Sequence, residues 1–233
     1  MPSIRRNTAT TTRTVFSPSP SGVGVQETEI EFTWYMGMST EVRRKSIQNL
    51  HEKCRSIGFT NVLEASSKSK QKLGIQLSAF FLKNILGYPV ENIFQSSKVF
   101  KDGGPYRDLL HVPPNTAKKD PRLKNSGPLT KFTLNKIDFP LEPKSLFYDW
   151  VYVNVLFSER NTHLRDEFFS SRFDAFSDIE FNPSKSFSCQ ARTLALCVSL
   201  YNNKCIDDFI HNPILFARAN SLYDSRMIQP RLL

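Results

Sequence analysis

The sequence predicts a single folded domain in which several helices accompany a few strands. A chain of 233 residues fits one domain, and a content of 39% hydrophobic and 12% aromatic residues can fill a substantial core. Apolar residues recur at helical spacing in several stretches, and they alternate with polar residues near the N-terminus. These observations together favour a mixed fold with more helices than strands.

The first third of the chain contains a polar segment followed by three predicted elements. Residues 1–27 are rich in Ser, Thr, Pro and Arg and offer little apolar surface, so we expect a flexible basic tail. Residues 29–36 alternate between apolar and polar, which predicts a half-buried strand. Ser39 can cap a helix that ends near Gly58. The apolar run 77–82 has the length of a buried strand.

A polar stripe on an otherwise apolar segment is the first candidate for a functional site. If a helix starts at Pro89 and continues to Phe100, Glu91, Gln95 and Lys98 lie at i, i+4 and i+7 on one face. The other faces are apolar, which is typical of a helix embedded in the protein. The stripe is compatible with a cleft that holds an acid, an amide and an amine. It is equally compatible with the solvated side of an amphipathic helix.

Basic residues are in excess and gather in one place outside the N-terminal tail. The formal charge is +9, and Lys118, Lys119 and Arg122 begin a basic patch that follows Pro113. Clustered basic side chains favour polyanionic partners, because they release counterions from a phosphate backbone. The patch is compatible with binding of a DNA backbone and also with an ordinary solvated surface.

The C-terminal half carries the clearest helical periodicity. Helices are predicted from Glu142 to about residue 157, over residues 163–173, and from about Cys189 onward. Arg192 lies near the N-terminal turn of the last of these, where free backbone N–H groups and a fixed positive charge favour an anion. We expect residues 216–233 to form a C-terminal tail.

Several classes of protein are disfavoured by what the sequence lacks. The four cysteines and four histidines are scattered without a CxxC pair, so no metal site is implied. The sequence contains no phosphate-binding loop, dinucleotide fingerprint or nucleophile elbow. No apolar run approaches the ~18 residues of a membrane span, and the N-terminus lacks a signal-peptide core. We therefore expect a soluble cytoplasmic protein without a membrane partner.

An ordered series of short motifs resembles the NADAR (YbiA-like) family, and within it the NADAR antitoxins that accompany DNA-modifying DarT-type ADP-ribosyltransferase toxins. The motifs span roughly residues 28–210, and we assign residues 28–215 to the domain. They are Ser66–Ser69, Leu77–Phe80, Val90–Phe100, Gly103–Tyr106, Ala117–Leu123, Leu141–Lys144 with Phe147–Trp150, Phe176–Pro183 and Cys189–Arg192.

The resemblance implies an α+β fold with many helices around a small sheet, and cleavage of a bond between a ribose and a nitrogen. In the antitoxin branch the substrate is guanine in DNA bearing ADP-ribose, and a cognate toxin is an expected partner. In the YbiA branch the substrates are phosphoribosylated intermediates of riboflavin synthesis. A third alternative is a module that binds ADP-ribose or NAD without turnover. None of these calls for a metal or redox cofactor.

The resemblance also implies which residues line the pocket. Glu91 and Asp178 are candidates for the carboxylate near the anomeric carbon and the proton donor near the departing nitrogen. Lys98 is either a nucleophile that forms an imine or a charge partner. The expected substrate-binding residues are Lys68, Gln95, Phe139, Asn182, Gln190 and Arg192. Of these, Arg192 would hold the diphosphate, and Phe139 replaces a tryptophan that related sequences often have. Lys118, Lys119 and Arg122 would hold the nucleic-acid backbone.

Overall fold

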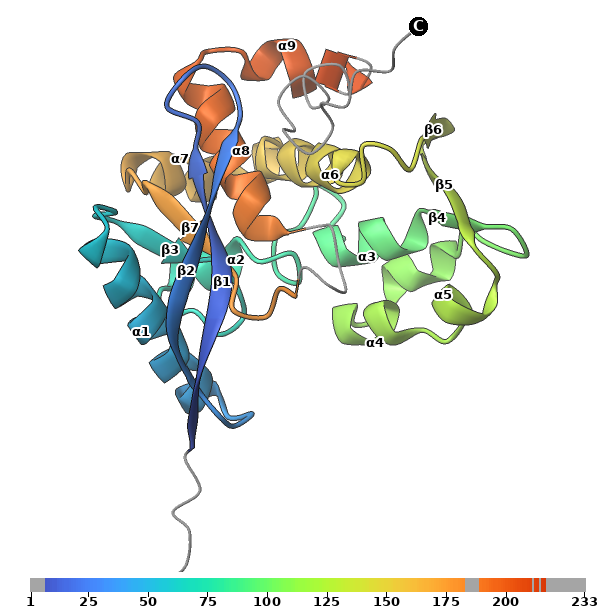
Figure 1. Cartoon of the computed structure of the whole chain (residues 1–233). Helices are drawn as coiled ribbons and strands as arrows, with labels where there is room; N and C mark the ends of the chain where they lie inside the picture. Colours follow the sequence, from blue (N-terminus) through green and yellow to red (C-terminus); the bar gives the residue numbers. More distant parts are fainter. Residues whose placement is uncertain (1–6, 183–188, 211, 214, 217–233) are drawn as a thin grey trace, which may run out of the picture.

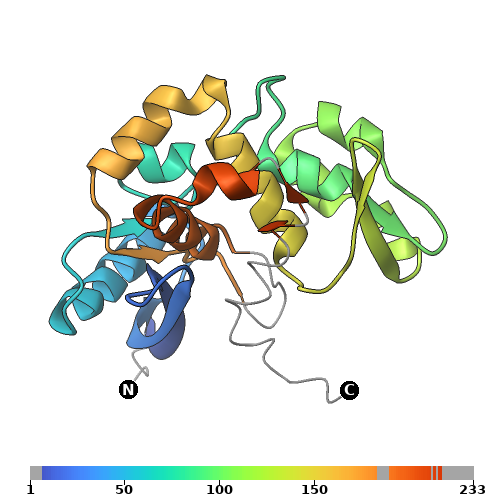
Figure 2. The same ribbon diagram turned by 90° about the horizontal axis from the view of Figure 1, so that it is seen from above.

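The chain forms a single α+β domain with a sheet at either end and helices between them (Figures 1 and 2). The computed structural model describes residues 7–182, 189–210, 212–213 and 215–216. The larger sheet has the strand order β2-β1-β7-β3, and the smaller sheet has the order β4-β5-β6. The α+β class expected from the resemblance is thus confirmed.

The larger sheet is built around a long hairpin at the N-terminus. Strand β1 (Thr8–Pro18) pairs antiparallel with β2 (Val25–Tyr35) along its whole length. It also pairs with the short strand β7 (Ala175–Ser177), which runs parallel to β3 (Val62–Glu64). The strand predicted at residues 29–36 is therefore confirmed as part of β2.

The prediction of a flexible tail over residues 1–27 is wrong from Thr8 onward. Residues 8–14 are mostly threonine, which is a β-branched residue with a high preference for strands. Only Val15 and Phe16 of β1 are both apolar and deeply buried. This amount of apolar surface is too small to reveal the strand by its pattern, although it suffices once β1 is paired on both sides.

Helix α1 (Thr40–Ser56) covers one face of the hairpin (Figure 1). The Oγ of Ser39 accepts a hydrogen bond from the N–H of Val42 at 3.3 Å, as expected for an N-cap. Gly58, with φ at +109°, follows the end of the helix. The predicted helix is confirmed. Its apolar side packs in a small core between α1 and the sheet, which contains Val15, Ile30, Phe32, Ile47, Leu50, Cys54, Val62, Ala175 and Ile179.

The main core surrounds helix α6 (Leu146–Leu156), which is buried on nearly all sides. It contacts α3 (Val90–Ser96), α8 (Gln190–Asn202) and α9 (Ile206–Ile210). Phe147 of α6 stacks on Phe132 with ring centroids 4.5 Å apart, and this contact joins the helices to the smaller sheet. The smaller sheet consists of β4 (Lys98–Phe100), β5 (Leu129–Leu134) and β6 (Ile137–Phe139).

Two predicted elements differ from the structure. The helix expected from Pro89 to Phe100 ends at Ser96, because the hydroxyls of Ser96 and Ser97 donate to the carbonyl of Ile93 and β4 begins at Lys98. Residues 77–82 form turns and not a strand, and the N–H of Leu82 donates to Ser78 O at 2.9 Å. Leu77, Ala79 and Leu82 are buried as expected, whereas Phe81 is 52% exposed, and burial alone does not distinguish a strand from compact turns.

The remaining elements are short and surround the core. They are α2 (Lys72–Gln76), η1 (Arg107–His111), α4 (Pro114–Lys119), α5 (Arg122–Asn125), η2 (Glu159–Asn161) and α7 (Thr162–Ser170). Phe216, the first residue of the predicted C-terminal tail, is buried against Trp150, so the tail prediction is wrong at that residue. Residues 217–233 lie outside the described ranges. In the part of the chain that the structure describes, no helix is long and apolar enough to cross a membrane.

Candidate active site

Two carboxyl groups lie at the same edge of the larger sheet. Glu64 is the last residue of β3, and Asp178 directly follows the parallel strand β7. Glu64 is only 2% exposed, and it accepts hydrogen bonds from Ser66 Oγ (2.6 Å), Ser177 Oγ (2.5 Å) and the N–H of Ile179 (2.9 Å). Burial raises the pKa of Glu64, and these three donors oppose that shift because they stabilise the ionised form of the carboxyl group.

Asp178 is held beside Glu64 by two donors. The N–H of Glu180 donates to Asp178 Oδ1, and Gln190 Nε2 donates to Oδ2, each at 3.0 Å. Burial, followed by the negative charge of Glu64, raises the pKa of Asp178 from 3.8 to about 8. Since Glu64 has more donors than Asp178, we infer that Glu64 loses its proton first. Asp178 is then mostly protonated at neutral pH and can act as a proton donor.

A short chain of hydrogen bonds links Asp178 to the polar stripe on α3. Gln190 Oε1 accepts from the N–H of Ala79 at 2.7 Å, and the carbonyl of Ala79 accepts from the N–H of Glu91 at 2.9 Å. Gln190 Nε2 also donates to the carbonyl of Ala65. Tyr148 is buried nearby, and the charges of Glu91 and Asp178 both add to the effect of burial in raising its pKa. The structure thus brings together Asp178, Gln190 and Glu91.

Glu91 and Lys98 form the second half of this site, although Lys98 lies in β4 and not on the helix. Glu91 is 5% exposed and accepts a hydrogen bond from Gln95 Nε2 at 2.8 Å. The Nζ of Lys98 lies 4.8 Å from the ring centroid of Phe94. Burial lowers the pKa of Lys98 from 10.5 to about 8, opposed by the charge of Glu91 and assisted by that of Lys118. An appreciable fraction of Lys98 is therefore a neutral amine near pH 8.

Gln95 offers a further group to a ligand. Its Oε1 atom is buried and has no hydrogen-bond partner within the described residues. A buried acceptor without a partner costs free energy unless a bound molecule satisfies it. This supports the predicted substrate-binding role of Gln95.

Lys118 of α4 contacts this site, and its role in binding a nucleic-acid backbone stays a prediction. Its Nζ lies 4.0 Å from Glu91 Oε2 and 5.3 Å from the ring centroid of Phe80. Its charge also lowers the pKa of both Lys98 and Asp178. Lys118 thus joins the two halves of the site electrostatically, which the patch prediction did not anticipate.

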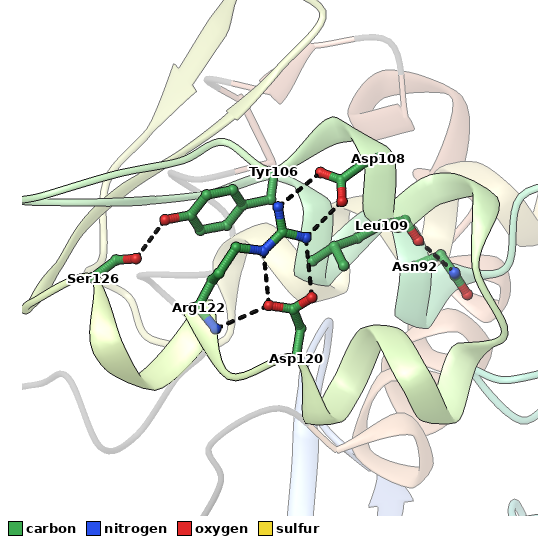
Figure 3. Close-up of polar contacts among 7 residues, drawn as sticks. All are labelled: Asn92, Tyr106, Asp108, Leu109, Asp120, Arg122 and Ser126. Atoms are coloured by element: carbon green, nitrogen blue, oxygen red, sulfur yellow. Dashed lines mark hydrogen bonds and ion pairs between the residues drawn. The ribbon is translucent and has the colours of Figure 1, made fainter.

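The two other residues of the predicted patch differ from Lys118. Lys119 is exposed at the end of α4, and its role in backbone binding stays a prediction. Arg122 binds both Asp108 and Asp120, and its guanidinium lies 4.4 Å from the ring centroid of Tyr106 (Figure 3). Because these carboxylates already engage its donors, Arg122 links η1 to α5, and its geometry does not favour the predicted phosphate contact.

Asn92 fixes the segment that precedes Lys118. Its buried Nδ2 donates to the carbonyls of Leu109 and Val112, both at 2.7 Å (the first bond is drawn in Figure 3). These bonds attach η1 and the start of α4 to helix α3, which carries Glu91. The position of Lys118 relative to Glu91 therefore depends on one buried amide.

Four predicted substrate-binding residues are not part of this network. Arg192 is 4% exposed, and its Nη1 contacts Asp149 Oδ2 at 2.8 Å. Phe139 is buried between Phe147 and Trp150, so its predicted stacking on a base is not favoured. Lys68 lies in the loop after β3, and Asn182 is exposed next to residues 183–188, which lie outside the described ranges. Roles for Arg192, Lys68 and Asn182 stay predictions.

Glu64 is the site residue that the sequence analysis missed. It lies within Val62-Leu63-Glu64-Ala65, and a single acidic residue in an apolar strand is a usable signal because burial of an unpaired carboxylate is costly. Within the described ranges, no three His, Cys, Asp or Glu side chains are placed to hold a metal ion. A surface hollow of about 850 Å³ between α7 and α8 contains none of the residues discussed above.

Comparison with known proteins was made at two levels. A search of curated proteins found no match. A family model described as DarT1-associated NADAR antitoxin matches residues 11–227. The match begins within β1, which agrees with β1 being part of the fold and not a tail. The chain therefore belongs to the family of DarT1-associated NADAR antitoxins.

Proposed function

We propose that this protein is an N-glycosidase that removes ADP-ribose from guanine in DNA and thereby reverses the modification made by a cognate DarT-type toxin. Membership of a DarT1-associated antitoxin family implies such a toxin as a partner. The observation that carries the proposal is the chain Asp178–Gln190–Ala79–Glu91, which links the protonated carboxyl group of Asp178 to the backbone N–H of Glu91, the residue whose carboxylate lies near a lysine of lowered pKa.

Asp178 supplies the proton that the leaving group needs. As the bond from the anomeric carbon to the guanine nitrogen breaks, negative charge develops on that nitrogen and positive charge on the sugar. A carboxyl group with a pKa of about 8 is protonated at neutral pH, and it transfers its proton to the nitrogen. Glu64 remains ionised next to it and favours return of the proton in the following step.

Glu91 stabilises the positive charge on the sugar, with Lys98 and Lys118 on either side of it. Lys98 has two roles that remain open. As a neutral amine it attacks the anomeric carbon, forms an imine after ring opening, and is released when water adds and ADP-ribose departs. As an ammonium it stays a charge partner, and water attacks the sugar directly. Both routes convert the modified guanine and water into guanine and free ADP-ribose.

A release assay tests the proposal. The substrate is a single-stranded oligonucleotide with one ADP-ribosylated guanine, since the reacting bond is inaccessible in a stacked duplex. Mass spectrometry follows free ADP-ribose and the restored strand. We expect release by the wild type and a loss of about 10²- to 10³-fold in Glu91→Gln, which is the range for removing one group that stabilises charge in a transition state. Glu159→Gln is the matched control, because Glu159 is exposed on η2.

The assay also separates the alternatives. Tight binding of the oligonucleotide with no release by the wild type would identify a binding module. Cleavage of a small phosphoribosylated amine, with indifference to the oligonucleotide, would identify a metabolite glycosidase. Release that is equal in wild type and Glu91→Gln would remove Glu91 from the mechanism.

A further inference from the structure

Two arginines from different elements lie over the same aromatic ring near the site. The guanidinium carbons of Arg13 (β1) and Arg43 (α1) lie 5.1 and 4.4 Å from the ring centroid of Trp34 (β2). Burial and the neighbouring charge of Arg43 lower the pKa of Arg13. Two like charges held this close disfavour each other unless an anion is present, so the arrangement is suited to bind one.

Nearby carboxylates do not engage all the charged donor groups of Arg13 and Arg43. Among the described residues, Arg13 has no carboxylate within 4.0 Å, and its buried Nε has no hydrogen-bond partner. Arg43 has one partner, Glu180, with Nε and Oε1 3.6 Å apart. By contrast, Arg122 binds two carboxylates, and Arg192 is buried against Asp149. Arg13 and Arg43 therefore fit an external anion better than the two arginines that the sequence analysis selected.

The arginine pair borders the catalytic edge of the sheet. The pairing of Phe16 with Phe176 places β1 against β7, and Asp178 follows directly after β7. The carboxyl group of Asp178 acts on the pKa of Arg13, and Glu180, which Arg43 contacts, lies two residues beyond it. An anion bound between Arg13 and Arg43 would thus lie next to the reacting sugar.

The basic surface continues away from the site along α1. Arg44 follows Arg43 and donates to the carbonyls of Lys68 and Ser69, at 3.3 and 3.2 Å. The Nζ of Lys70 in the same loop donates to Gln48 of α1. In Figure 1, α1 lies alongside the β1–β2 hairpin. Arg13, Arg43, Arg44, Lys68 and Lys70 thus belong to β1, α1 and the adjoining loop, and they outnumber the two phosphates of one ADP-ribose.

We propose that the single strand next to the modified nucleotide runs over the β1–β2 hairpin and α1, with Arg13 and Arg43 holding its phosphates. The inference rests on the proposed function for the identity of the strand. Its physical basis is general, because a polynucleotide offers a phosphate at every nucleotide and an arginine fork binds phosphate oxygens in pairs. In this proposal Lys68 contacts the DNA backbone.

Binding of unmodified single-stranded DNA tests the site without any turnover. The probe is a fluorescein-labelled oligothymidine of about a dozen nucleotides, within the length that one such surface covers. Anisotropy gives Kd between 50 and 200 mM salt. For single strands the slope of log Kd against log salt is about 0.7 per phosphate contact, so Arg13→Gln/Arg43→Gln should lower it by about 1.4. The ratio of Kd at 200 mM salt to Kd at 50 mM salt should then be about sevenfold smaller in the double variant than in the wild type.

A matched control removes the same charge elsewhere. Lys83→Gln/Lys101→Gln takes two exposed basic residues that lie outside both basic surfaces, and it should leave the slope within about 0.3 of the wild type. Lys119→Gln/Lys124→Gln is the competing arm, because a larger loss of slope there than in the arginine variant would overturn the proposal and place the strand on the α4–α5 surface. Absence of DNA binding by the wild type would overturn it as well.

Two further measurements keep the result interpretable. Arg43→Lys retains the charge and should retain the slope, and Arg43→Gln alone should lose about 0.7 of it if the double variant does not fold. Titration with free ADP-ribose forms the other arm. If the arginine variant loses affinity for ADP-ribose but keeps its DNA slope, the pair holds the diphosphate, and the strand path is wrong. A wild type that binds DNA through these arginines but releases no ADP-ribose would refute only the proposed function.

Discussion

The protonation of Asp178 can be tested through stability, without a substrate. The folded protein raises the pKa of this group from 3.8 to about 8, so the folded state holds a proton that the unfolded state has lost. A group whose pKa is raised on folding stabilises the protein fully below its unfolded pKa, and this contribution is lost as pH rises toward the folded pKa. Wild type should therefore become less stable than Asp178→Asn as pH increases from 4 to 8.

The size of the effect follows from the same pKa shift. One pH unit in this window corresponds to about 1.4 kcal/mol, so from pH 5 to 7.5 the free energy of unfolding of the wild type should fall by up to roughly 3 kcal/mol relative to Asp178→Asn. Because Asp178 is half-buried and its surroundings can relax, we expect a relative fall in the free energy of unfolding of about 2 to 3 kcal/mol. Glu64 is present in both proteins, so its own titration largely cancels in the difference.

Urea denaturation at half-unit steps between pH 5 and 8 measures this difference. Asp207→Asn, which alters an exposed aspartate on α9, is the control and should give a curve parallel to that of the wild type. If the curves of wild type and Asp178→Asn are parallel too, Asp178 is ionised in the folded protein at neutral pH. It could not then donate the proton, and the proposed mechanism would lose its acid.

Three further predictions concern Lys98 and two residues that support the site. If Lys98 is the nucleophile, Lys98→Arg should lower activity at least 100-fold, because arginine does not form a neutral amine. Mass spectrometry after borohydride treatment should then detect a trapped adduct only in the wild type. A trapped adduct in the variant would contradict this role. Gly74→Ala should lower the free energy of unfolding by about 1 to 3 kcal/mol, measured by urea denaturation, because a Cβ there would overlap the carbonyl oxygen of Glu64. An unchanged midpoint of the urea transition would show that α2 can move away. Asn92→Leu should lower the free energy of unfolding by about 1 to 3 kcal/mol, because it leaves the carbonyls of residues 109 and 112 unpaired. It should also slow the release of ADP-ribose, because Lys118 would be displaced. Full activity would show that other contacts hold Lys118.

Local patterns were sufficient for elements that have strong periodicity and clear caps. Helix α1 follows from Ser39 and its apolar spacing, and α8 begins at Gln190, next to the predicted start at Cys189. Helix α6 begins at Leu146, where its apolar repeat starts, and not at Glu142 as predicted. The central helix was predicted too long, because its apolar residues continue past Ser96 while local serine hydroxyls and pairing with β5 end it. A periodic pattern reports burial more reliably than it reports where an element stops.

The site was predictable only where short motifs carried it. Glu91, Asp178 and Gln190 lie in the motifs quoted for the family resemblance, and the structure joins them through hydrogen bonds. Arg13 and Arg43 were missed because their proximity depends on the pairing of β1 with β2 and on α1 packing against β2, and their position near Asp178 depends on the pairing of β1 with β7, two strands from opposite ends of the chain. Pairing of this kind leaves no trace in the local sequence of a threonine-rich strand.

The backbone of Ala79 connects the side chain of Gln190 to the backbone N–H of Glu91. Among ordinary replacements only proline, which lacks an N–H, would delete the bond to Gln190, so scanning with other side chains would pass over this position. Chemical synthesis that exchanges the amide N–H of residue 79 for an ester oxygen would remove the donor to Gln190. The position of Gln190, and with it that of Asp178, is thus tied to the start of α3 through a unit that every amino acid except proline can supply.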